Sequence, residues 1–307
     1  MERKTLRTRK EDVMISKILI FVFMVWMLPT SWATAEENNL SPDSSATQQN
    51  AQPEGNQQFQ GFNLQGYTDG GQKAWDVNGD KADIVGDTIS ITNVDANQYS
   101  EQQLNLKAKT GVVNKATGSI HLAQDVVITS KDGSQFKTDT LQWERDQDLV
   151  TTDDPITVTT EKGMSATGTG LVAKPSLGTA QVKKDVTVKV ETQPDKPAGG
   201  NSELTITSDG PMEIDQKNNK ATFTKNVVAS QEGRTLNSDR MEVYFDAETQ
   251  KIKRLVCLGN VVIMQGENSS TSDTAIYTAG DQKLVLTGRP KLILMTQGGE
   301  GLASFKK

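Results

Sequence analysis

The stretch "GNVVIMQGENSSTSDTAIY", Gly259–Tyr277, joins a short apolar run to a Ser-Asp pair, and its Asp273 follows Val261 by twelve residues. Closely similar phrases occur at 226–244, "NVVASQEGRTLNSDRMEVY", and at 125–143, "DVVITSKDGSQFKTDTLQW". A phrase that recurs three times indicates a repeated structural unit rather than a single active site.

The repeat extends through both halves of the chain. Each unit has a first mark, where an apolar run starts, and a second mark, a small or acidic residue that precedes the next run. The gap from a second mark to the next first mark is mostly 17 or 18 residues, which gives a period of about 30 residues. The first marks fall at Val126, Ile156, Val186, Val227 and Val261, and the second marks at Ala108, Asp139, Gly168, Asp209, Asp239 and Asp273.

The local pattern within each unit is that of β-strands. In "DVTVKVE", Val186, Val188 and Val190 alternate with polar residues, which is typical of a half-buried strand. Turn-forming sequences such as "NKATG" and "AGDQ" separate the runs. We find no convincing amphipathic helix after residue 35. The pattern predicts an all-β protein in which each unit is two strands joined by a loop, stacked as a continuous antiparallel structure with one apolar inner face.

The Ser-Asp or Thr-Asp pair at the second mark has a structural interpretation. Asp and hydroxyl side chains cap backbone N–H groups at turns, so we expect these pairs to lie in turns just before a strand. The alternative is that the acids bind a ligand or an ion.

Composition limits the classes of function. After residue 35 the net charge is −9, which argues against a nucleic-acid partner because phosphate binding needs basic surface. The one cysteine, Cys257, is expected to be a small buried residue rather than a reactive thiol. His121 lies between Ile120 and Leu122, so the alternation points it outward. The sequence has no metal-ligand spacing, no Gly-rich phosphate loop and no G-x-S-x-G, so we predict no catalytic residue, cofactor or metal.

The N-terminus predicts export. A basic segment precedes the apolar run "ILIFVFMVWML" at 18–28, and Ala33-Thr34-Ala35 matches a small-x-small cleavage site. The run is short for a bilayer span, which needs about 20 residues. Residues 1–35 are therefore interpreted as a signal peptide or a signal anchor, and both remain open.

Composition also predicts the domain organisation. Residues 36–58 have almost no apolar content and are expected to form a disordered tether. "ETQPDKPAGGNS", at 191–202, contains two Pro and two Gly and predicts a linker or long loop over 192–202. Two β domains, 59–191 and 203–307, flank it. Because the repeat keeps its gaps on both sides, we predict that they join into one continuous groove.

Two groups of motifs carry a resemblance to known families. Residues 62–190 resemble the periplasmic part of LptC, through "GYTDGGQKAWDVNGDKADI" at 66–84, "QDVVITSKDGSQFKTDTLQW" at 124–143, "DDPITV" at 153–158, "ATGTGL" at 166–171 and "KDVTV" at 184–188. Residues 203–307 resemble the OstA/LptA family, through "LTITSDGPMEID" at 204–215, "ATFTKNVVASQ" at 221–231, "LNSDRMEVYFD" at 236–246, "GNVVIMQG" at 259–266 and "LVLTGRPKLIL" at 284–294.

The resemblance implies a fold and a function. It implies twisted antiparallel β-jellyrolls of the OstA-like kind, in a non-enzymatic bridge component that shields the acyl chains of lipopolysaccharide between the inner and outer membranes. Its implied partners are lipopolysaccharide, other export components joined by edge-strand pairing, and the inner membrane if the chain is anchored; its implied location is the periplasm at the inner membrane. Separate LptC-like proteins usually keep a membrane anchor. The cleavage-like site Ala33-Thr34-Ala35 is a departure from that pattern and puts anchoring in doubt. The C-terminal part is also short for a complete LptA-like domain.

Two rival functions remain. A structural β-repeat scaffold or filament protein would use the same edges to polymerise and would carry no lipid. An enzyme such as a β-helical polysaccharide hydrolase would need clustered carboxylates, whereas the acids here recur once per unit. Stoichiometric lipid uptake distinguishes the carrier from the scaffold.

Strand parity predicts which side chains contact lipid. The assignment assumes no bulge within the short strands, because one extra residue inverts the parity beyond it. The predicted inner-face residues are Val126, Ile128, Val158, Val186, Val188, Phe223, Val227, Ala229, Val261, Ile263, Leu284 and Leu286.

Overall fold

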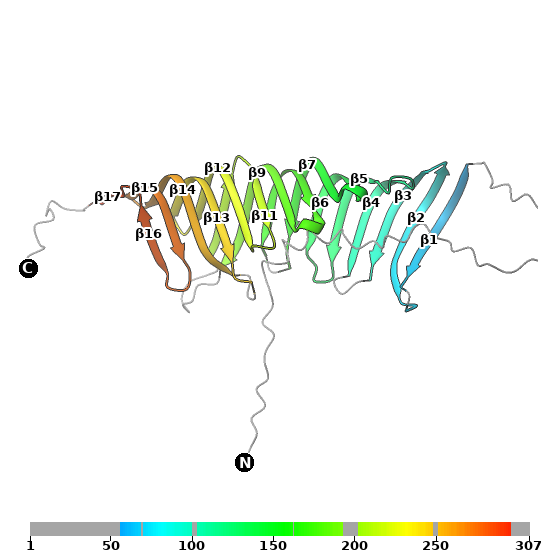
Figure 1. The fold of residues 1–307 in the computed structure, drawn as a ribbon, viewed down its shortest axis with the longest axis horizontal. Helices are drawn as coiled ribbons and strands as arrows, with labels where there is room; N and C mark the ends of the chain where they lie inside the picture. The colour runs from blue at the N-terminus through cyan, green and yellow to red at the C-terminus, as the bar shows by residue number, and fades with distance from the viewer. Residues whose placement is uncertain are drawn as a thin grey trace, which may run out of the picture.

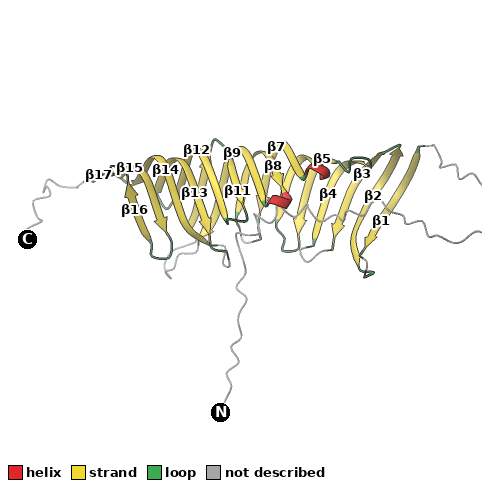
Figure 2. Cartoon of the chain, viewed as in Figure 1, coloured by secondary structure: helices red, strands yellow, loops and turns green. Residues whose placement is uncertain are grey.

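The computed structural model describes residues 56–68, 70–99, 103–161, 163–192, 202–247 and 251–295. These residues form a single sheet of 17 strands with two short 3-10 helices (Figure 2). The predicted all-β class is therefore confirmed. The strands are β1 (Gln57–Tyr67), β2 (Lys73–Val85), β3 (Thr88–Gln98), β4 (Leu104–Asn114), β5 (Ile120–Ser130), β6 (Gln135–Glu144), β7 (Leu149–Thr159), β8 (Ser165–Lys174), β9 (Thr179–Thr192), β10 (Ser202–Ser208), β11 (Met212–Asp215), β12 (Lys220–Gln231), β13 (Arg234–Phe245), β14 (Ile252–Gln265), β15 (Asn268–Thr278), β16 (Lys283–Thr287) and β17 (Lys291–Ile293), and the 3-10 helices are η2 (Arg145–Gln147) and η3 (Pro175–Leu177).

Consecutive strands pair antiparallel from β1 to β9 and from β12 to β16, so the sheet is a long meander that runs in a row (Figure 1). β10 and β11 together fill the place of one strand, because both pair with β9 on one side and β12 on the other. Asp209, Gly210 and Pro211 separate them. Backbone pairing therefore continues across the predicted linker at 192–202.

The first marks of the repeat lie at a bend within the strands. Val126, Val227 and Val261 each follow a register shift in the pairing with the next strand. The residues just before them, such as Asp125, Asn226 and Asn260, have positive φ values. Extra residues of this kind form β-bulges, which bend a strand sharply. The marks therefore do not start strands, as the sequence had suggested, but lie in the middle of them.

The second marks lie on the neighbouring strands at the same bend, which we call the fold line. The expectation that Ser-Asp and Thr-Asp pairs occupy turns is wrong for three of them, because Asp139, Asp239 and Asp273 lie inside β6, β13 and β15. It holds for Asp209, which lies between β10 and β11. In each pair the hydroxyl residue is buried and the following aspartate is exposed. A small inward residue fits here because the two halves of the sheet come close together at the bend.

The exposed aspartates bind the bulges of the next strand. Asn226 donates to Asp209 over 2.7 Å, and Asn260 donates to Asp239 over 2.9 Å. A Cβ atom at Gly259 would lie 2.4 Å from the Asp239 carboxylate, and its φ of 76° is one that glycine favours. The recurring phrase thus specifies a bend, with Ser-Asp on one strand and Asn or Gly on the next.

The core follows from this bend. Alternate side chains are buried on both sides of the fold line, for example Phe223 and Val227 in β12. Since the described residues contain no α-helix, only the other half of the same sheet can cover them. The sheet therefore folds over along its length and encloses one apolar interior, as in a β-jellyroll.

The N-terminal predictions lie outside the described residues. The predicted signal or anchor, 1–35, and most of the tether, 36–58, fall before residue 56. The predicted end of the tether is wrong, because Gln57 and Gln58 already belong to β1. Among the described residues, no helix is long and apolar enough to cross a membrane.

Candidate functional site

An apolar opening in the interior lies between the two halves of β2 to β6. It is a cavity of about 390 Å³ with a mainly aliphatic lining. Leu64 of β1, which is 41% exposed, also lines it, so the cavity reaches the N-terminal end of the sheet. The lining residues are Leu64, Val77, Asp87, Ile89, Ile91, Val94, Ala96, Asn97, Gln98, Leu104, Leu106, Gly111, Val113, Asn114, Lys115, Ala116, Gly118, Ile120, Leu122, Ile128, Leu141, Trp143 and Arg145.

Small residues help to keep the cavity open. Gly111 faces the interior, where an added Cβ would lie 3.0 Å from Val94 and 3.3 Å from Leu122. Ala96, opposite Val77 and Leu106 in the neighbouring strands, also contributes little volume. Further along the sheet, Val227 is 0% exposed and belongs to the packed core.

The predicted inner-face residues divide into three groups. Val188, Ile263 and Leu286 are half-buried and pack against the core. Leu284 is 46% exposed on β16, near the end of the sheet. The fully buried group consists of Val126, Ile128, Val158, Val186, Phe223, Val227, Ala229 and Val261.

Only Ile128 of the predicted residues lines the cavity. The other lining residues were missed because the parity argument started from the first marks, and these begin at Val126. A usable signal was present in "ISITNV" at 89–94, where Ile89 and Ile91 alternate with polar residues. Asn93 has a positive φ, which shifts the inward–outward alternation by one residue. Val94 therefore faces inward, as Ile91 does.

The cavity has a cationic end. The connections β2–β3, β4–β5 and β6–β7 lie on the same side of a meander, and they bring Asp87, Lys115 and Arg145 to the lining. The Lys115 backbone N–H donates to the Asp87 carbonyl over 2.8 Å. The Arg145 guanidinium lies 5.8 Å from the centroid of the Trp143 ring, within range of a cation–π contact.

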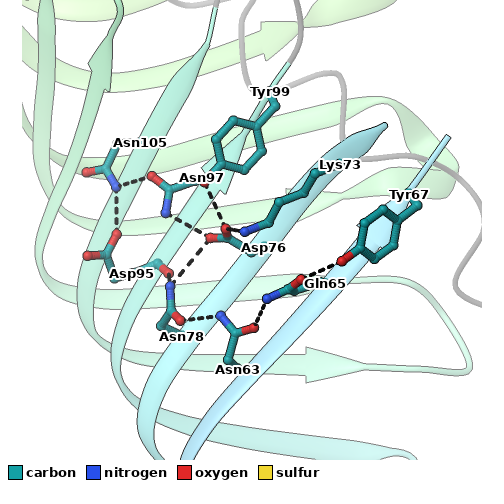
Figure 3. A network of polar contacts seen from close by, with 10 residues as sticks. All are labelled: Asn63, Gln65, Tyr67, Lys73, Asp76, Asn78, Asp95, Asn97, Tyr99 and Asn105. Carbon is teal, nitrogen blue, oxygen red and sulfur yellow. Dashed lines mark hydrogen bonds and ion pairs between the residues drawn. The ribbon is translucent and has the colours of Figure 1, made fainter. Parts of the chain in front are cut away.

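The outer face of the first strands carries a polar network (Figure 3). Its centre is Asp76, which is 3% exposed and forms an ion pair with Lys73. Asn97 donates to Asp76 over 2.9 Å, and the Tyr99 hydroxyl donates to it over 2.8 Å. Asn105 extends the network to β4 with a 2.8 Å bond to Asn97. The network cross-links the four consecutive strands β1 to β4, because Asn78 joins Asn63 of β1 to Asp76.

The titrations of two groups reflect their surroundings. Burial acts to raise the pKa of Asp76, but the hydrogen bonds from Lys73 and the other donors outweigh it and lower the pKa below the ordinary value. Burial raises the pKa of the Cys257 thiol to about 11, so this thiol is protonated at neutral pH. The expectation of a buried cysteine is confirmed.

The described residues provide no metal site. Among them, no cluster of three His, Cys, Asp or Glu side chains could hold a metal ion. His121 is exposed, as the alternation predicted, and its Nδ1 lies 2.9 Å from the Gln142 amide oxygen. The arrangement is suited to holding an apolar molecule between two β walls.

A long folded sheet with an apolar interior is the architecture of OstA-like β-jellyroll proteins. Residues 17–191 match the family described as "Lipopolysaccharide-assembly, LptC-related", and residues 205–302 match "LptA/(LptD N-terminal domain) LPS transport protein". Because the first match covers more than half of the chain, the chain belongs to the LptC-related lipopolysaccharide-assembly family. A comparison with curated proteins found no match.

The matches confirm the resemblance of both halves and their order. They assign the chain a role in lipopolysaccharide transport. The gap between the two matched ranges, 192–204, contains the connection from β9 to β10.

Proposed function

We propose that this protein is a non-enzymatic carrier that shields the acyl chains of lipopolysaccharide inside its folded sheet. The observation that carries the proposal is the apolar cavity between the halves of β2 to β6. The interior of β12 to β15 would continue the path, because the sheet is unbroken between the two halves.

Such a carrier must cover a large apolar area of the lipid but bind the lipid with only modest affinity. Exposed apolar surface costs about 25 cal/mol per Å² in water, so an aliphatic wall stabilises an acyl chain without any polar anchor. A wall formed by two halves of one bent sheet can also separate by small changes at the fold line. Tightly packed positions such as Val261 would line the path only when the halves move apart.

The two ends of the sheet are the proposed contacts with other export components. β1 begins the sheet and β16 and β17 end it (Figure 1). An edge strand can pair with a strand of another protein. Exposed apolar side chains accompany both edges, including Phe59 and Leu64 on β1 and Leu292 on β17. Pairing at both ends would extend one conduit through several proteins.

The location proposed for the protein is the periplasm at the inner membrane. The family match begins at residue 17 and so includes the apolar run 18–28. We propose that residues 1–35 direct export, either as a cleaved signal or as an anchor, and that the residues from 36 to the start of β1 act as a tether. The β units proposed for 59–191 and 203–307 then stand in the periplasm, joined at 192–202.

Purification from cells that make lipopolysaccharide tests the proposal. We expect lipopolysaccharide to co-purify with the full-length protein in stoichiometric amount, because the acyl chains account for the binding. The oligosaccharide of lipopolysaccharide, freed of its acyl chains, should not displace the bound lipid, because the oligosaccharide lacks the apolar acyl chains. The amount and mass of the bound lipid would be measured by mass spectrometry.

The rival functions predict different results. A scaffold protein would yield polymers without stoichiometric lipid, and an enzyme would yield lipid of altered mass. Either result would overturn the carrier proposal.

A further inference from the structure

We propose that the cationic end of the apolar cavity binds the phosphate of an acyl-chain amphiphile, so that the cargo enters with a defined polarity. The inference rests on the proposed carrier function and adds the chemical group recognised and the side chains that recognise it. These side chains are Lys115, Arg145 and Trp143.

The first argument is charge. Lys115 is exposed and Arg145 half-buried at the same end of the cavity, and neither forms an ion pair with a described carboxylate. Asp87 also lines this end, so the side chains there carry one net positive charge. A planar guanidinium and an ammonium are the groups that proteins use to bind phosphate.

The second argument is an unsatisfied donor. Trp143 lines the cavity and is 95% buried, and its indole Nε1 has no hydrogen-bond partner among the described residues. A buried N–H without a partner is costly, so such groups normally have a hydrogen-bond acceptor. A ligand with an acceptor oxygen next to its anionic group would satisfy this one.

The third argument is geometry. The Arg145 guanidinium lies over the Trp143 ring, so the cation and the unsatisfied N–H belong to one locus. Gly118 packs close by, since an added Cβ there would lie 3.6 Å from Arg145 Cδ. Beyond this locus the lining becomes aliphatic, with Ile120 and Leu122 leading inward. A phosphate at the mouth and an acyl chain in the interior match this order of groups.

The test compares lipids that differ only in phosphate. Binding of lipopolysaccharide, and of lipopolysaccharide stripped of its phosphates, would be measured with the full-length protein in one detergent. The double substitution Lys115→Gln with Arg145→Gln should weaken binding of the phosphorylated lipid roughly 10-fold or more and leave the stripped lipid nearly unchanged. Arg145→Lys in place of Arg145→Gln should restore part of the loss.

The matched control is Lys131→Gln. Lys131 is an exposed cation in the β5–β6 connection, on the opposite side of the meander, and it does not line the cavity. This substitution should change neither affinity. Phosphatidic acid and diacylglycerol form a second pair of lipids that differ in a phosphate. If the phosphate strengthens binding only in lipopolysaccharide, the site is specific for the cargo. If it strengthens binding in both pairs, the site binds phosphorylated amphiphiles in general.

The indole provides a readout independent of affinity. In the ¹⁵N-labelled protein, the Nε1–H resonance that Trp143→Phe removes should shift downfield when the phosphorylated lipid binds. Equal affinity for phosphorylated and stripped lipid, unaltered by the double substitution, would overturn this inference while leaving the carrier function intact. Failure to bind either lipid would instead overturn the carrier function itself.

Discussion

Replacing Val227 by aspartate should destabilise the protein by about 4 kcal/mol or more, or prevent it from folding. Val227 is completely buried just after the bulge of β12. Its surroundings are apolar core residues, so a carboxylate there would have no partner. The free energy of unfolding would be measured by denaturant titration of the full-length protein, followed by circular dichroism.

The neighbouring residue provides the matched control. Val228 is half-buried on the opposite face of the same strand, where it pairs with Thr207 and Asn237. Val228→Asp should therefore change the free energy of unfolding by no more than about 1 kcal/mol. Similar losses from both substitutions would mean that the sheet does not have one inner and one outer face.

Filling the cavity should abolish most lipid uptake. In Ala96→Trp an indole ring would project from β3 into the space between the two halves of the sheet. We expect lipopolysaccharide binding to weaken roughly 10-fold or more, which corresponds to at least about 1.4 kcal/mol. Because the ring enters existing space, it should largely avoid the cost of about 1–3 kcal/mol for an overpacked core.

Val112→Trp is the control for this substitution. Val112 is 38% exposed and lies on β4 outside the set of residues that line the cavity. The same ring added there should leave lipid binding unchanged. Undiminished binding in a folded Ala96→Trp protein would show that the lipid lies elsewhere.

The sequence predicted the strands better than their bend. Alternation of apolar and polar residues identified the β-strands and placed Val186 and Val261 on the buried face. It could do so because a strand that is buried on one face needs apolar residues at every second position. The bend could not be predicted in the same way, because Asn and Asp are common both in turns and in positive-φ bulges. Asp239 was therefore assigned to a turn, although it lies in the middle of β13.

The site could be predicted only in part. Parity separates inward from outward side chains, but it does not distinguish a packed interior from an open one. Val126 and Ile91 have equivalent patterns, yet only Ile91 lines the cavity. That difference depends on how far apart the two halves of the sheet lie, and on small residues such as Gly111 on a neighbouring strand.

Site-specific photocrosslinking in living cells tests the central claim, that lipid travels inside the folded sheet. A photoreactive amino acid would replace Val113 and Val112 in β4, and in separate proteins Ile263 and Val262 in β14. Val113 lines the cavity and Ile263 packs against the core, whereas their neighbours lie on the other face. The carrier account predicts lipopolysaccharide adducts from positions 113 and 263 and none from 112 and 262. Equal adducts from both faces, or no adduct from either inward position of the folded protein, would contradict it.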